Sequence, residues 1–147
     1  MRQRPVDLER LAAALDILAT DIHHGLVPLP DALQRTARAT PAAAGELLAR
    51  AARLSAAGDM TVAEAWERAL DQGIDRTALL AGDTEILRSL GCVLGRSLSD
   101  DQLRHLALAR DRLAAAAGEA REEARRGERL RVYLGTLGAA ALILFLW

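Results

Sequence analysis

The sequence is poor in aromatic residues, in cysteine and in β-branched side chains. Aromatic residues make up 3% of its 147 residues, and Cys92 is its one cysteine. A single cysteine excludes an internal disulfide framework and a metal site built from paired cysteines. Ala, Leu, Arg and Glu dominate instead, a composition typical of all-α proteins. We therefore expect a single helical domain.

A strong net charge is also absent, which bears on the classes of partner and reaction. The formal net charge is −1 and the pI is about 6.3, so no overall field favours nucleic acid as a partner. His23, His24 and Cys92 do not have catalytic or metal-ligand spacing. We expect the two histidines to cap a helix end and Cys92 to be buried. The sequence predicts a protein that is not an enzyme and has no cofactor or metal.

The long uncharged run is the end of the chain, residues 132–147, which reads VYLGTLGAAALILFLW. At about 1.5 Å per residue it reaches about 24 Å, and arginine side chains beside it can extend to the membrane surface. Four arginines mark its cytoplasmic flank: Arg125, Arg126, Arg129 and Arg131. We predict a cytoplasmic helical bundle over residues 1–131 and a transmembrane segment over 132–147. A buried core helix is the alternative.

Apolar spacing predicts about six helices, in a compact bundle whose last helix runs into the transmembrane segment. Pro28 and Pro30 form the corner after the first helix, which ends at Gly25. A capping box is predicted at Thr61–Glu64 and another at Ser99–Gln102. Asp83 is expected to cap the fifth helix, after a loop with one helical turn. The predicted core includes Leu15, Ile22, Trp66, Leu90 and Leu106.

Four stretches, in this order, resemble the stage III sporulation protein AB family: residues 20–33 (TDIHHGLVPLPDAL), 63–70 (AEAWERAL), 83–103 and 134–138 (LGTLG). The resemblance implies a component of the channel complex that joins mother cell and forespore during endospore formation. It implies a place in the mother-cell membrane facing the forespore, crossed once by this chain. The family is similar to the F-type inner-membrane platform protein of type II secretion and type IV pilus machines. That similarity implies a non-enzymatic scaffold which couples a secretion-type ATPase to the membrane.

The resemblance is densest at the corner that contains Pro28 and Pro30. A simple turn between two helices does not need two prolines. We expect contact with other channel components at Asp16, Asp21, His24, Pro28, Pro30 and Asp31. A purely structural corner is the alternative. Membrane lipid is the other expected partner, nucleic acid is not expected, and self-association is left open.

Two further expectations concern the start of the chain and a rival function. The family usually begins with a membrane segment, which residues 1–5 do not provide, although Arg2 and Arg4 would suit its cytoplasmic flank. The rival function, from a different class, is a tail-anchored adaptor or regulator that binds a partner helix and is unrelated to sporulation.

Overall fold

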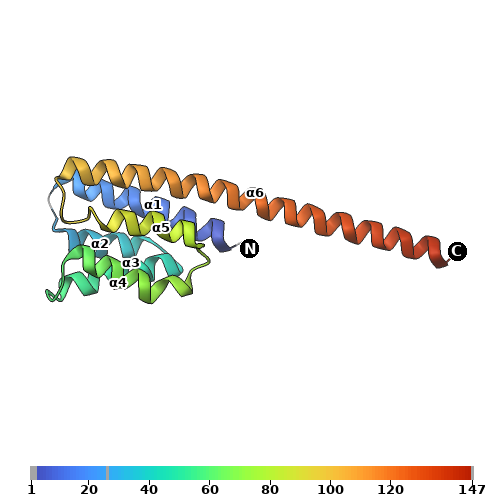
Figure 1. Ribbon diagram of the computed structural model, residues 1–147, viewed down its shortest axis with the longest axis horizontal. Helices are drawn as coiled ribbons and strands as arrows, with labels where there is room; N and C mark the ends of the chain where they lie inside the picture. Colours follow the sequence, from blue (N-terminus) through green and yellow to red (C-terminus); the bar gives the residue numbers. More distant parts are fainter. Residues whose placement is uncertain (1–2, 26, 147) are drawn as a thin grey trace.

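The computed structural model describes residues 3–25 and 27–146. These residues form six α-helices and one short 3-10 helix: α1 Gln3–His24, α2 Leu29–Ala39, α3 Ala42–Ala56, α4 Val62–Gly73, η1 Ile74–Arg76, α5 Ala81–Gly91 and α6 Ser99–Leu146. Each helix packs on the next along the chain, and α6 closes the ring by packing against α1, which is the most extensive helix contact in the bundle. The C-terminal half of α6 projects alone from the bundle (Figure 1). The all-α prediction, with about six helices and an uninterrupted last helix, is confirmed.

Local signals set several helix ends. Gly25 ends α1 with φ +64°, and its amide donates to the carbonyls of Asp21 and Ile22. At the start of α4, the Thr61 hydroxyl accepts a hydrogen bond from the Glu64 amide at 3.2 Å, and the Glu64 carboxylate accepts one from the Thr61 amide at 3.3 Å. This is the predicted capping box, which satisfies two backbone donors that the helix leaves unpaired.

Two other helix starts differ from the prediction. α5 begins before Asp83, whose carboxylate lies in the first turn and accepts a hydrogen bond from the Leu80 amide at 2.9 Å. The predicted Ser99–Gln102 box is replaced by a bond from the Gln102 side-chain amide to the Ser97 carbonyl at 2.7 Å. In both helices a side chain of the first turn, Asp83 or Gln102, bonds to a backbone group of a residue that precedes the helix. The helices therefore begin earlier than predicted, at Ala81 and at Ser99.

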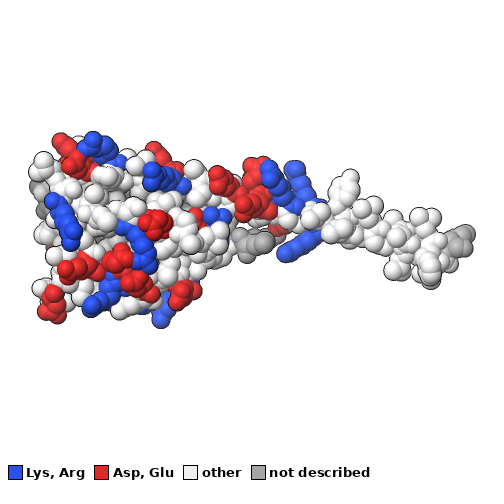
Figure 2. Space-filling model, in the orientation of Figure 1, with Lys and Arg blue, Asp and Glu red and all other residues white. Residues whose placement is uncertain are grey.

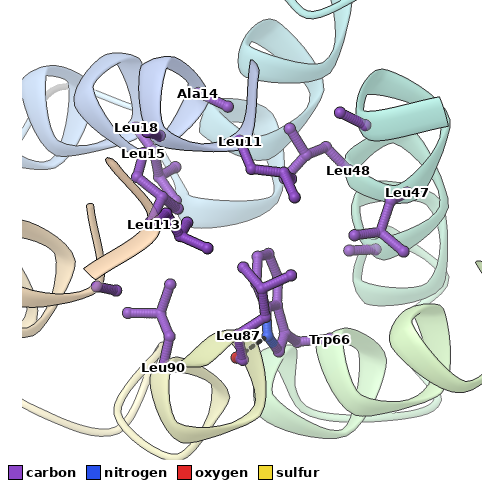
Figure 3. Packing of buried hydrophobic residues seen from close by; sticks show 14 of the residues in the cluster. Leu11, Ala14, Leu15, Leu18, Leu47, Leu48, Trp66, Leu87, Leu90 and Leu113 are labelled. Atoms are coloured by element: carbon purple, nitrogen blue, oxygen red, sulfur yellow. Dashed lines mark hydrogen bonds between the residues drawn. The ribbon is translucent and has the colours of Figure 1, made fainter. Parts of the chain in front are cut away.

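One tryptophan sits in a core built otherwise of leucine and alanine. Trp66 is 1% exposed, and its indole Nε1 donates a hydrogen bond to the Leu87 carbonyl at 2.7 Å (Figure 3). Gly91 allows this close approach, because a Cβ there would lie 2.6 Å from Trp66 Cδ1. The indole therefore joins α4 to α5 through both packing and a buried hydrogen bond.

The other predicted core residues separate into two groups. Leu15, Leu90 and Leu106 are buried, with relative exposures of 2% or less. Ile22 is only partly buried, although it packs against the core cluster. It lies in the last turns of α1, near the end of the bundle where the chain turns into α2, so fewer helices surround it (Figure 1).

Two buried carboxylates fasten the start of α1 to the first turn of α5 and to the segment before it. Asp83 accepts two hydrogen bonds from the Arg4 guanidinium, at 2.8 and 3.0 Å. Asp7, which is fully buried, accepts one from the Ala78 amide at 2.9 Å and one from the Gln3 side chain at 2.9 Å. Arg4, expected to flank a membrane segment, is thus held against α5 with its side chain 18% exposed. Arg2 lies outside the described residues.

Candidate functional site

The two halves of α6 have different surroundings. The first half packs on the bundle through Leu106, Ala109, Leu113, Ala117 and Ala120, spaced three or four residues apart. Ion pairs hold this half antiparallel to α1: Arg110 lies 3.2 Å from Asp16, and Arg121 lies 2.6 Å from Glu9. Beyond Ala120, none of the described residues of α6 is buried.

The end of α6 exposes a continuous apolar surface. Nine large side chains between residues 132 and 146 are each more than half exposed, and Phe145 reaches 91%. The helix contains a stretch long and apolar enough to cross a membrane, and none of that stretch is buried in the bundle. The alternative of a buried core helix is therefore wrong. Exposed apolar surface of this extent marks a site of contact with lipid or with another protein. Trp147 lies outside the described residues.

A belt of positive charge precedes this apolar surface. We call Arg125, Arg126, Arg129 and Arg131 the arginine collar; all four are exposed. Within residues 3–25 and 27–146, no carboxylate forms an ion pair with any of them. Figure 2 shows blue side chains gathered on the projecting helix, immediately before the uncharged white tail. The collar is thus available to solvent or to a charged partner.

The predicted partner surface lies at the opposite end of the bundle from the tail (Figure 1). Asp16 is engaged with Arg110, and Asp21 lies 3.7 Å from Arg35 of α2. Pro30 is half-buried in the first turn of α2. The remaining residues of the predicted set are exposed: His24, Pro28 and Asp31. The structure therefore places two of the acidic residues in surface ion pairs between helices and leaves Asp31 at the surface.

A second turn, which is not part of the predicted partner surface, adjoins this corner. It connects α5 to α6 and contains Gly95, at φ +75°; a Cβ on that glycine would lie 3.8 Å from Leu29 Cδ2. Leu98 in the same turn is 82% exposed. Residues 20–33 and 83–103, the two longest family-like stretches, thus meet at this end. We call His24, Pro28, Asp31 and Leu98 the distal surface.

The described residues offer little for catalysis or metal binding. Among them, no group of three or more His, Cys, Asp or Glu side chains is placed to hold a metal ion. Cys92 is exposed, so its predicted burial is wrong. Cys92 follows the last residue of α5 with helical backbone angles (φ −64°, ψ −24°), and its thiol lies 3.9 Å from the Arg88 carbonyl oxygen. It therefore lies on the side of the helix that carries Arg88, away from the apolar face.

Comparison with known proteins identifies the family. The family model described as stage III sporulation protein AB matches residues 1–147. Stage III sporulation protein AB of Bacillus subtilis (strain 168) is 29% identical over 144 residues, which cover 98% of this chain and 84% of that protein. A solved structure, stage III sporulation protein AB (SpoIIIAB), aligns with a TM-score of 0.78 and 28% identity, covering 83% of this chain and 96% of its own. These matches argue against an adaptor unrelated to sporulation. The chain belongs to the stage III sporulation protein AB family.

Proposed function

We propose that this protein is a non-enzymatic scaffold of the mother cell–forespore channel complex. Residues 132–147 anchor it in the mother-cell membrane, and the bundle lies in the mother-cell cytoplasm. The observation that carries the proposal is the uninterrupted α6, which joins the packed bundle to an uncovered apolar end. The family to which the chain belongs supports the role in sporulation.

The arginine collar supports the orientation. Arginine and lysine close to a membrane segment favour the cytoplasmic side, and the collar lies between the bundle and the apolar end of α6. The bundle and the collar are therefore cytoplasmic, and the C-terminus lies across the membrane, toward the forespore.

The distal surface is the proposed contact with other channel components, including a secretion-type ATPase. It faces away from the apolar end of α6, so a cytoplasmic partner can reach it without approaching the membrane (Figure 1). Exposed Leu98 supplies apolar area for the contact. The negative charge of Asp31 favours a partner with a positive charge at the matching position and so fixes how the two proteins are oriented. The ATPase assignment rests on analogy with secretion platforms at the level of the fold.

The anchor is tested with the full chain carrying a C-terminal reporter. We expect the protein to stay with membranes after alkaline extraction and to need detergent for release. The reporter should be protected from protease added to the cytoplasmic side. Recovery of the intact chain as a soluble monomer after lysis contradicts the anchor.

The contact is tested by charge reversal at the distal surface in the source organism. Asp31→Arg should reduce both sporulation and copurification of an ATPase from detergent extracts, with thermal stability unchanged. Asp21 needs a different variant because it pairs with Arg35. The exchange Asp21→Arg with Arg35→Asp keeps the ion pair and reverses the charges that a partner meets.

Asp75→Arg is the matched control, because Asp75 is exposed in η1 and lies outside the distal surface. It should sporulate and copurify the ATPase as the unmodified protein does. If the distal variants also behave normally, the corner is architectural and the partner binds elsewhere.

A further inference from the structure

We propose that a groove along α6 binds a membrane helix of another protein, and that this helix carries acidic residues where it leaves the membrane. The inference rests on the membrane anchor proposed above. It goes further by naming a second contact surface, separate from the distal surface, and the kind of partner that fits it.

Three hollows along α6 join into one groove. The first lies between α1 and α6, begins at Arg110 and ends at Arg121, which also lines the second. The second and third hollows share Arg125 and Glu128, and the third reaches Tyr133. The groove therefore follows α6 for 23 residues, about 35 Å, and ends at the start of the uncharged run.

α1 forms one wall of the groove. The two helices lie side by side along the bundle, and α6 continues past the start of α1 (Figure 1). Pro5 and Val6 line the second hollow together with Arg125, so α1 borders the groove as far as this arginine. Beyond it the groove is formed by α6 alone, and a partner there can contact the exposed side chains of the helix directly.

The floor of the first hollow consists of small residues. Ala114, Ala117 and Gly118 lie between Arg110 and Arg121, each of which forms an ion pair with α1. A Cβ added at Gly118 would meet no atom within 4 Å, so the space above this glycine is open. A second helix can therefore approach closely here, with its larger side chains in the hollow, as an amphipathic helix does in a groove.

The line of the groove continues into the apolar end of α6. Gly135 and Ala139 follow Val132 at spacings of three and four residues, so the three lie on one side of the helix. In membranes, small residues at such spacing let two helices pack closely. A helix that fills the groove can thus continue into the membrane beside the tail, whereas a soluble helix would leave this side uncovered.

The charge beside the lower part of the groove favours an acidic partner. Residues 121–131 contain five arginines and three glutamates, so their formal charge is 5 − 3 = +2. This sum counts every charged side chain of the stretch, including Glu128, which has a partner, and Arg121 and Glu123, which pair with α1. A second copy anchored in the same orientation would bring the same charge to the same level, and like charges across an interface cost free energy. A different protein is therefore favoured.

The experiment uses the full chain in the sporulating source organism, with a diazirine amino acid at Ala115 or at Tyr133. These positions are 18 residues apart, about five helical turns, so both lie on the same side of the groove. After illumination, both should cross-link to the same integral membrane protein. Mass spectrometry of the cross-linked peptides should place the two sites on one helix, about 18 residues apart, with Asp or Glu between them.

Gly118→Leu tests the groove by filling it. The melting temperature should not fall, because the position is open and leucine favours helix more than glycine does. The yield of cross-linked product should fall about ten-fold at both positions. Gly82→Leu is the matched control, because Gly82 is equally open and exposed but lies in α5, outside the groove. It should leave the yield unchanged.

Arg125→Gln with Arg129→Gln tests the charge. It should lower the yield with an acidic partner, whereas it would raise the yield between two copies of this chain, whose repulsion it relieves. The inference is overturned by cross-links between two copies, to two different proteins, or to a protein that alkaline extraction releases. It is also overturned by no cross-link at either position or by an unchanged yield in Gly118→Leu. Release of this chain itself by alkaline extraction contradicts the anchor, whereas a retained chain without cross-links contradicts the groove alone.

Discussion

The Arg4 guanidinium and the Asp83 carboxylate meet in a two-pronged ion pair, although 79 residues separate them in the sequence. The side chains are 18% and 5% exposed. Their contact fixes the first turn of α1 against the first turn of α5, close to where α6 leaves the bundle (Figure 1). The pair therefore stabilises the end of the bundle nearest the apolar tail.

Removing one partner of this pair should destabilise the bundle. Arg4→Ala leaves a buried carboxylate with a single remaining donor, and the free energy of unfolding should fall by about 3 kcal/mol. Arg38→Ala, at an exposed position of α2, should change it by less than about 0.5 kcal/mol. Urea unfolding of both variants in the same detergent, followed by circular dichroism, measures the difference. Equal stability would show that the pair contributes nothing net.

The same pair should make stability depend on pH. Burial alone would raise the pKa of Asp83, but hydrogen bonds from Arg4 and from the Leu80 amide outweigh it and hold this pKa below its ordinary value of 3.8. A lowered folded-state pKa stabilises the protein fully above the unfolded value, and the contribution is lost as pH falls through the folded value. Stability should therefore drop below about pH 4.

The double variant Arg4→Gln with Asp83→Asn isolates this contribution from that of the other carboxylates. Its free energy of unfolding should fall less steeply between pH 5 and pH 3 than that of the unmodified protein, because neither replacement titrates. Parallel pH profiles for the two proteins would assign the acid sensitivity to other groups.

Trp66 should contribute through both its volume and its hydrogen bond. Trp66→Ala removes the largest buried side chain and should cost about 3–5 kcal/mol. Trp66→Phe keeps an aromatic ring but loses the bond to the Leu87 carbonyl, and should cost about 1–2 kcal/mol plus the effect of the smaller ring. Chemical denaturation of the two variants measures both costs; a loss of similar size in the two would assign the whole effect to the hydrogen bond.

Gly91 and Gly118 should respond in opposite directions to alanine. At Gly91 the new methyl group would collide with the Trp66 ring, so Gly91→Ala should destabilise by about 1–3 kcal/mol. At Gly118, in the middle of α6, an added Cβ would meet no atom within 4 Å. Gly118→Ala should therefore stabilise by up to about 1 kcal/mol through helix propensity. Melting temperatures of the pair provide the measurement, and shifts of the same sign would contradict the packing described for Trp66.

Most of the helices could be predicted from the sequence because their signals are local. The Thr61–Glu64 capping box and the Gly25 stop depend on residues within four positions of each other. Cys92 was misplaced because its burial was inferred from its neighbours Leu90 and Val93 and from the usual burial of cysteine, not from its position on the helix. It follows Arg88 by four residues on helical backbone, so it lies on the same side of α5 as that arginine.

The buried carboxylates and the distal surface could not be predicted in the same way. Asp7 has one partner nearby, the side chain of Gln3, but its other hydrogen bond comes from an amide 71 residues away, which no local pattern indicates. Leu98 reads as an ordinary apolar residue in a turn. Only the fold brings that turn to the Pro28–Pro30 corner, where a Cβ on Gly95 would lie 3.8 Å from Leu29 Cδ2. Contacts between residues far apart in the sequence require the packed bundle, whereas the apolar end of α6 is evident from composition alone.

The unbroken α6 also sets a spacing. Ala120 is its last buried residue, but the start of α1 reaches further along it, because Pro5 and Val6 line a hollow together with Arg125 and Glu128. From Glu128 to Val132, where the uncharged run begins, the helix rises by about 6 Å. With the tail in the bilayer as proposed, the start of α1 therefore stands close to the membrane surface. A neighbouring helix, with a diameter of about 10–12 Å, does not fit between the two.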